Sequence, residues 1–198
     1  MESMVKKYQQ RFRKAGDDIE RWANLQSRLI LQFRNASSII ERLQVLQDSS
    51  NYGSLINVGD IRDAVLTKQM ESLQSIFLSM EKTLDEFHGV VLSLGKIQRD
   101  GKQMMKVGSN QPSLKQLKQR VGVKPSLADC MDGLMLLHEM HHSEYLLKSS
   151  LVSALSALVL KFNSSDLSAI QQLLVDQPNI PKEEVQIIFD IIFAEEIS

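Results

Sequence analysis

The stretch that decides the fold is VKKYQQRFRKAGDDIERWANLQSRLILQFRNASSIIERL, residues 5–43. Its apolar positions recur at alternating steps of three and four residues, with Gln26 in the single polar gap. A heptad seam sustained for about six heptads predicts one long helix that lies along a partner helix. The seam comprises Val5, Tyr8, Phe12, Ala15, Ile19, Trp22, Leu29, Phe33, Ala36, Ile40 and Leu43. We expect the helix to end near DSSNYG, residues 48–53, because small polar residues and glycine cluster there.

A second seam follows Asp60, a residue type that favours the N-cap position of a helix. It is expected to fade at RDGKQ, residues 99–103. Two seams of similar length joined by a short loop predict an antiparallel helical hairpin over residues 1–100. The second seam comprises Leu66, Met70, Leu73, Phe77, Met80, Leu84, Phe87, Val91 and Leu94.

Residues 101–126 differ in composition, because they hold six basic residues and no acidic one. Glycines and prolines interrupt this stretch and predict a linker, with one helical turn near Leu114–Leu117. A basic run of this kind is commonly a solvated loop, and the alternative is a contact for phosphate or an acidic partner. No aromatic residue lies between the basic ones, so base stacking is not expected in the linker.

The C-terminal region, residues 127–198, predicts one long and two shorter helices that pack on the hairpin. Ser126 is placed to cap the long helix, which we expect to reach about Phe162. NSSD at residues 163–166 ends it and precedes a short helix over Leu167–Val175. Pro181 opens the last helix, whose first turn carries two glutamates. The predicted fold class is therefore all-α.

Residues 138–142, HEMHH, match the H-E-x-x-H spacing with which zinc metallopeptidases bind their metal. His138 and His142 would share a helix face, with Glu139 as the base. Three observations oppose this hypothesis: His138 lies in a continuous seam, no third ligand is evident, and no strand is predicted to hold a peptide substrate. We therefore predict no catalytic residue, no metal and no cofactor, and keep a zinc metalloenzyme as the disfavoured alternative.

The long C-terminal helix carries a third seam, from Leu127 to Phe162. This seam is polar in its middle, where the inward positions are taken by His138, His141, Tyr145 and Lys148. Polar residues in a seam specify register and partner at some cost in stability, so we predict that these four contact a partner. The last helix is apolar on nearly every side, so a second predicted contact comprises Ile188, Ile192 and Phe193. The alternative for those three is burial within the chain itself.

Composition is that of an ordinary soluble protein: 198 residues, 43% hydrophobic and 24% charged, with a net charge of −1. That charge gives no global attraction to nucleic acid, so no direct nucleic-acid binding is expected. Cys130 is the single cysteine, which fits a reducing compartment. The polar N-terminus and the short apolar runs predict neither a signal peptide nor a membrane span.

Several stretches resemble a known family. LINVGDIRDAVLTKQMESLQSIFLSMEKTL (55–84) matches its Asp-Ile-basic core and following Lys-Gln, and PSLADCMDGLMLLHEMHHSEYLLKSSLVSAL (125–155) matches its Pro-Ser-x-Ala-Asp opening. SSDLSAIQQL (164–173), KEEVQIIFDIIFAEE (182–196) and Trp22 match further positions. In the order and spacing of these segments, residues 20–198 resemble the AIRIM family of ribosome maturation factors. HEMHH is not part of the family pattern, and the similar cyclin-dependent-kinase-interacting family is an alternative.

The resemblance implies a non-enzymatic helical adaptor of a type II AAA+ ATPase, paired with a homologous helical protein. It implies a role in late maturation of the large ribosomal subunit, indirect association with pre-ribosomal particles, and handling of replication proteins on chromatin. Localisation in nucleus and cytoplasm follows from those roles. A coiled-coil scaffold in an unrelated complex is the alternative that the seams alone allow.

Overall fold

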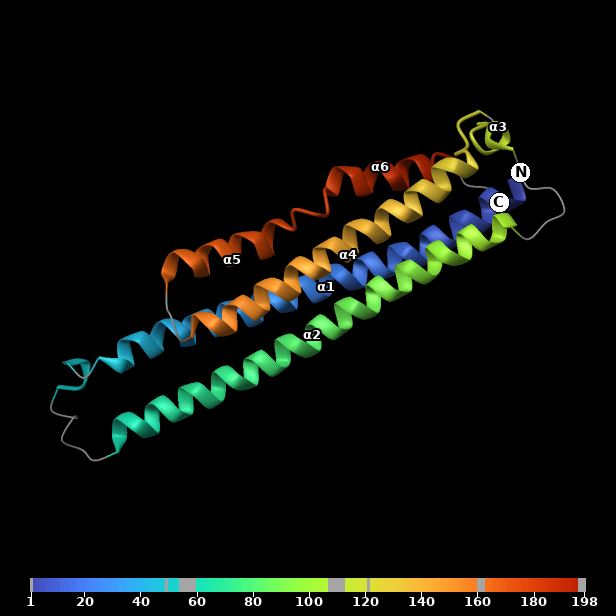
Figure 1. The fold of residues 1–198 in the computed structure, drawn as a ribbon. Helices are drawn as coiled ribbons and strands as arrows, with labels where there is room; N and C mark the ends of the chain where they lie inside the picture. Colours follow the sequence, from blue (N-terminus) through green and yellow to red (C-terminus); the bar gives the residue numbers. More distant parts are fainter. Residues whose placement is uncertain are drawn as a thin grey trace. The chain divides into compact units, whose positions relative to one another are not determined.

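The computed structural model of the chain describes residues 2–48, 50–53, 60–106, 113–120, 122–159 and 163–195. Across those ranges there is no β-strand, and the predicted all-α class is confirmed. No helix in them has a segment long and apolar enough to cross a membrane. The helices are α1 (Glu2–Gln47), α2 (Ile61–Lys106), α3 (Leu114–Leu117), α4 (Leu127–Leu158), α5 (Ser164–Asp176) and α6 (Lys182–Ile192) (Figure 1).

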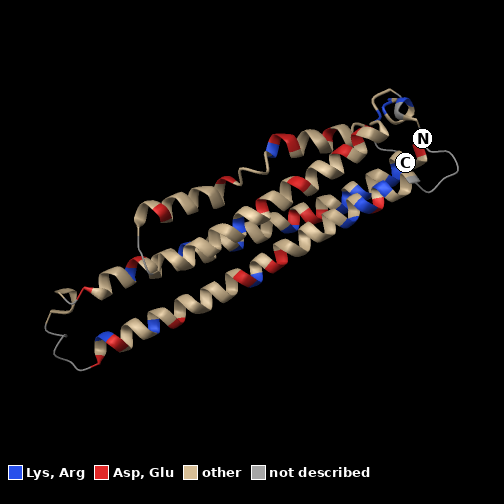
Figure 2. Cartoon of the chain, in the orientation of Figure 1, with Lys and Arg blue, Asp and Glu red and all other residues tan. Residues whose placement is uncertain are grey.

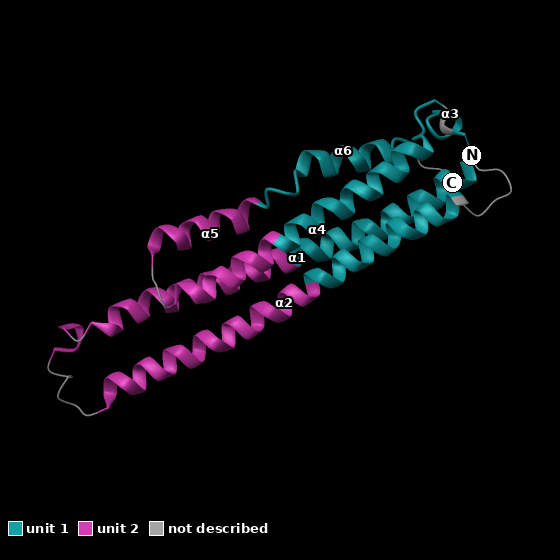
Figure 3. Ribbon diagram, viewed as in Figure 1, with its two compact units in different colours: residues 1–24, 87–146, 177–198 teal, residues 25–86, 147–176 magenta. Residues whose placement is uncertain are grey.

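The chain forms two compact units, and α1, α2 and α4 each contribute a segment to both (Figure 3). Unit 1 comprises residues 1–24, 87–146 and 177–198, and unit 2 comprises residues 25–86 and 147–176. Each unit thus combines hairpin segments with segments of the C-terminal region, as expected for helices that bury their apolar faces against one another.

The seam of α1 is buried throughout, apart from the half-buried Ile19. Its polar member, Gln26, is buried as well, and its Nε2 donates a hydrogen bond to the carbonyl of Leu174 in α5. A buried amide is tolerated in an apolar seam when it has such a partner. As predicted, α1 ends just before the DSSNYG stretch, at Gln47.

Contacts in each unit show that α1 and α2 are antiparallel. In unit 1, the Tyr8 hydroxyl donates to the carbonyl of Gly101 at 2.9 Å, and the rings of Trp22 and Phe87 meet at 4.4 Å. In unit 2, Gln32 Nε2 donates to the Ser79 hydroxyl at 2.7 Å. Residue numbers rise along α1 as they fall along α2, so the predicted hairpin is confirmed.

Helix α2 begins directly after Asp60, whose carbonyl accepts the Ala64 N–H at 2.9 Å, as at an N-cap. It extends to Lys106, and the prediction that it fades at 99–103 is wrong. Gly101 explains the difference. It is buried, and a Cβ there would lie 3.2 Å from the Tyr8 ring and 3.2 Å from a Leu134 methyl. Tertiary packing against a residue without a side chain therefore outweighs the weak helix propensity of glycine.

α4 and α5 begin at residues whose side chains cap them. Ser126 Oγ accepts the Asp129 N–H at 3.1 Å, and Asp129 Oδ2 accepts the Ser126 N–H at 2.9 Å, which is a reciprocal cap of α4. α4 ends at Leu158, and the predicted end at Phe162 lies outside the described residues. The short helix predicted from Leu167 begins earlier, at Ser164, because Asn163 Oδ1 accepts the Ser165 N–H at 3.0 Å and caps it there.

Two glycines test the packing of unit 1. A Cβ on Gly133 in α4 would lie 3.0 Å from the Phe12 ring and 3.0 Å from an Ile188 methyl, whereas a Cβ on Gly89 in α2 would meet nothing within 4 Å. Overpacking costs about 1–3 kcal/mol, and alanine gains about 1 kcal/mol over glycine in a helix. We predict that Gly133→Ala lowers the free energy of unfolding by about 1 kcal/mol, while Gly89→Ala raises it by about 0.5–1 kcal/mol.

Urea unfolding followed by circular dichroism measures both variants against the unchanged chain. Stabilisation by both alanines would contradict the close approach of α1 and α6 to Gly133.

Candidate partner-binding sites

The four polar residues predicted to contact a partner from the middle of α4 do not form a single surface. In unit 1, His141 is fully buried, whereas His138 and Tyr145 are half-buried. In unit 2, Lys148 is fully buried. Two of the four residues predicted to specify a partner are thus inside the folded chain, and a partner role for all four stays a prediction.

His141 is held as a neutral core residue. Its Nδ1 lies 2.6 Å from the Leu137 carbonyl, which can only accept, so Nδ1 carries the proton. The Trp22 ring packs edge-to-face on the imidazole, with 4.9 Å between ring centroids. Burial lowers the pKa of His141 to about 4. Its Nε2 is buried and has no hydrogen-bond partner among the described residues.

A buried carboxylate lies one turn further along α4. Glu144 Oε2 accepts the backbone N–H of Asn179 at 3.2 Å and the Asn179 side-chain amide at 3.1 Å. Two residues before Asn179, Gln177 has a positive φ of 47°. Its Oε1 accepts the Trp22 indole N–H at 2.9 Å. Together these bonds fix the segment before α6 against α1 and α4 in unit 1. The local sequence does not indicate that Glu144 is buried and hydrogen-bonded, because its partner Asn179 is distant in the chain.

The HEMHH motif places two imidazoles together but not a metal site. The rings of His138 and His142 are nearly parallel, with centroids 5.9 Å apart. Burial lowers the pKa of His138, and the neighbouring His142 contributes in the same direction. Among the described residues no group of three or more His, Cys, Asp or Glu is arranged to hold a metal ion. A catalytic zinc needs three protein ligands, so the zinc hypothesis has no support in those ranges.

Cys130 offers no nucleophile. It is fully buried in α4, and burial raises the pKa of its thiol to about 12. The thiol therefore stays protonated and packs as a small apolar side chain.

The last helix packs within unit 1. Ile188 and Ile192 are buried, and the rings of Phe12 and Phe189 meet edge-to-face at 5.9 Å. Phe193 is half-buried, with the Arg13 guanidinium 5.8 Å from its ring centroid. The structure thus buries two of the three residues predicted for a second partner contact, and contact through them stays a prediction.

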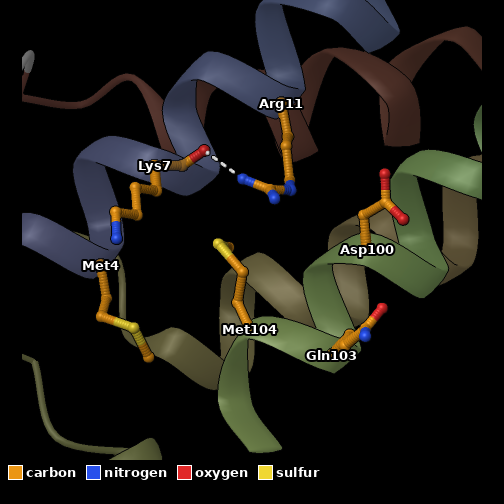
Figure 4. Close-up of a pocket in the computed structure, with 6 residues that line it drawn as sticks. All are labelled: Met4, Lys7, Arg11, Asp100, Gln103 and Met104. Carbon is orange, nitrogen blue, oxygen red and sulfur yellow. Dashed lines mark hydrogen bonds between the residues drawn. The ribbon is translucent and has the colours of Figure 1, made fainter. Parts of the chain in front are cut away.

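A hollow in unit 1 is lined by residues of both charges (Figure 4). It has a volume of about 400 Å³ between the start of α1 and the end of α2. Figure 4 shows Lys7 and Arg11 beside two methionines, with Arg11 donating to the Lys7 carbonyl at 3.2 Å. The lining comprises Met4, Lys7, Arg11, Asp100, Gln103 and Met104.

An apolar surface lies in unit 2, where α2 and α4 leave a groove. Its larger part has a volume of about 630 Å³ and is continuous with a part of about 260 Å³ through the shared residues Phe77 and Ser156. Met70 is 46% exposed there, and Leu66 and Phe77 are half-buried. We call this surface the α2–α4 groove. Its apolar lining comprises Leu66, Met70, Leu73, Phe77, Leu84, Val152 and Val159.

The groove exists because bulky side chains face small ones. α2 presents its heptad seam, while α4 presents Ser149, Ser153 and Ser156 at helical spacing. Serines fill too little volume to cover the seam, so apolar surface remains in contact with water. Among the residues that the structure describes, the charged members of the lining are Glu71 and Glu81. The seam was predicted from sequence, but its exposure was not.

The buried His141 predicts a defined dependence of stability on pH. The imidazole has a pKa near 6.5 when unfolded and about 4 when folded. Between these values the unfolded chain binds a proton that the folded chain excludes. The free energy of unfolding therefore falls as the pH falls from about 6.5 to about 4, by about 3 kcal/mol in total.

His141→Leu removes this titration. We predict that the variant loses less stability than the unchanged chain between pH 7.5 and pH 4.5, by about 3 kcal/mol in urea unfolding. Equal losses in the two proteins would show that His141 is protonated in the folded state.

One comparison with known proteins gives a match. The model of a family described as "CA109-like: Ribosome biogenesis protein C1orf109-like" matches residues 2–197, which is nearly the whole chain. A comparison with curated protein sequences finds no match.

Proposed function

This chain belongs to the C1orf109-like family of ribosome biogenesis proteins, and on that premise we propose that it is a non-enzymatic adaptor of an AAA+ ATPase. AIRIM is the name of C1orf109, so the family resemblance found in the sequence is confirmed. The proposed task is maturation of the large ribosomal subunit, carried out in nucleus and cytoplasm. The family is described by a cellular process and not by a reaction, which agrees with a protein that works by binding.

The observation that carries the proposal is the α2–α4 groove. An adaptor must expose a surface that recognises another protein, and a contiguous apolar patch is the usual form of such a surface. The α2 positions that line the groove keep heptad spacing from Leu66 through Met70 and Phe77 to Leu84. A seam with that spacing fits a second helix better than a flat protein surface.

The proposed occupant is a helix of a homologous helical protein, paired with this chain as a heterodimer. Such a helix would place an apolar stripe over Met70 and Phe77. Because the charged residues of the lining, within the part of the chain that the structure describes, are Glu71 and Glu81, the flanks of the partner helix would be basic. The pair, rather than either chain alone, would then contact the ATPase.

Two charge substitutions on α2 test this surface. Met70→Glu places a carboxylate in the groove, whereas Leu78→Glu places one at a neighbouring position that is 53% exposed and outside the groove lining. Burying an unpaired charge against apolar side chains costs several kcal/mol. We predict that Met70→Glu lowers recovery of the helical partner and the AAA+ ATPase by about tenfold or more, and that Leu78→Glu leaves recovery unchanged.

The measurement is affinity purification of each tagged variant from the cells of origin, with quantitative mass spectrometry. Equal recovery with both variants would exclude the groove as the site. Absence of an AAA+ ATPase from the unchanged chain's preparation would exclude the adaptor function itself.

A further inference from the structure

One face of unit 1 gathers planar rings and cations that the proposed adaptor role does not use. On α2, His88, Arg99 and Lys102 are spaced so that they share a helix face with Leu92 and Gly95. On α4, His138, His142 and Tyr145 also share a face. We call the six residues His88, Arg99, Lys102, His138, His142 and Tyr145 the ring face.

Contacts join the two rows into one surface. The rings of His88 and Tyr145 are nearly parallel, at 14°, with 5.2 Å between their centroids. Further along, a Cβ on Gly95 would lie 3.0 Å from His138 Nε2 and 3.4 Å from an Arg99 guanidinium nitrogen. Because Gly95 has no side chain, the imidazole and the guanidinium both approach the α2 backbone at that point.

The rings are accessible. His88 and His142 are exposed, His138 and Tyr145 are half-buried, and Leu92 in the α2 row is 55% exposed. None of the four rings belongs to the fully buried core of unit 1. The outer ring faces are therefore available to a planar ligand.

The cations are accessible as well. Arg99 and Lys102 are exposed, and neither forms an ion pair within the described ranges. Both act electrostatically on His138, as does His142, while the acidic residue that acts on it is the exposed Glu139. Figure 2 shows Lys and Arg gathered toward the C-terminal end of α2 and the start of α1. The ring face is thus locally basic in a chain whose net charge is −1.

We propose that the ring face binds single-stranded RNA. Unpaired bases stack on Tyr and His rings, and Arg and Lys contact the phosphates, which is the usual combination in proteins that bind single strands without strong sequence preference. An acidic peptide would need the cations but not the rings. RNA is the single-stranded nucleic acid that a ribosome biogenesis protein meets. The expectation of no nucleic-acid binding rested on the net charge and on the absence of aromatic residues from the linker, and neither concerns the ring face.

The proposal goes beyond the adaptor function, because the ring face lies in unit 1 and the α2–α4 groove lies in unit 2. Loss of one surface should leave binding at the other intact. A Met70→Glu chain should therefore still bind RNA.

The test is fluorescence anisotropy with a labelled single-stranded RNA of about 12 nucleotides, at about 50 and about 200 mM KCl and pH 7.5. The ring variant combines His142→Ala with Tyr145→Ala, and the charge variant combines Arg99→Gln with Lys102→Gln. The control combines Lys68→Gln with Lys82→Gln, which are exposed positions of α2 in unit 2. Circular dichroism and a thermal melt of every variant confirm that it is folded.

We expect the ring variant to bind about tenfold to a hundredfold more weakly, because it removes two rings and each base that loses its stacking partner loses about tenfold in affinity. The charge variant should also bind more weakly, with a salt dependence shallower by about 2 in slope. The control should match the unchanged chain.

Four results would overturn the proposal: no binding at about 50 mM KCl, equal binding of a duplex RNA of the same sequence, tighter binding of the matching single-stranded DNA, or full competition by polyglutamate at equal charge. Unaltered affinity of a folded ring variant would do the same.

Discussion

The buried apolar seam of α1 is the constraint on which the rest of the structure depends. α1 has 46 residues, and its seam has no position more exposed than half-buried. A seam of that kind must be covered along its whole length, and no single short helix can do so. The chain covers it with α2 in both units, with α6 in unit 1 and with α5 in unit 2. Two contacts illustrate this covering. Phe12 packs on Phe189 of α6, and Gln26 donates a hydrogen bond to Leu174 of α5.

Heptad spacing was sufficient to predict the long helices, because alternating steps of three and four residues have no other regular solution. The cap at Ser126 was also predictable from residue type, since its hydroxyl accepts an N–H group of the first turn of α4. Gly101 was not predictable in this way. Glycine is a weak helix former, so its place in the sequence predicted a helix end, whereas in the structure its missing side chain leaves room for Tyr8. Long-range packing of this kind leaves no trace in local sequence.

The candidate sites were also only partly predictable from the sequence. His141 and Lys148 occupy seam positions, and the seam correctly indicates that they face inward, but it does not indicate whether another chain or the same chain covers them. In the isolated chain, both residues are buried by the chain itself. The α2–α4 groove depends on serines in α4 that look unremarkable in sequence and matter only because Phe77 and Met70 lie opposite them. HEMHH matches a metal-binding motif in sequence. In the structure, His141 lies in the core, whereas His138 and His142 lie on the ring face.

Hydrogen exchange on α2 tests the proposed pairing, in which another helix covers the seam of α2 between Leu66 and Leu84. Exchange of the backbone amides of residues 61–84 should be compared in the isolated chain and in the complex purified from cells through a tag on this chain. We predict that these amides exchange much more slowly in the complex, and that the exchange of residues 87–98 changes little. Equal exchange of residues 61–84 in the two preparations would contradict it, because the groove would then have no occupant.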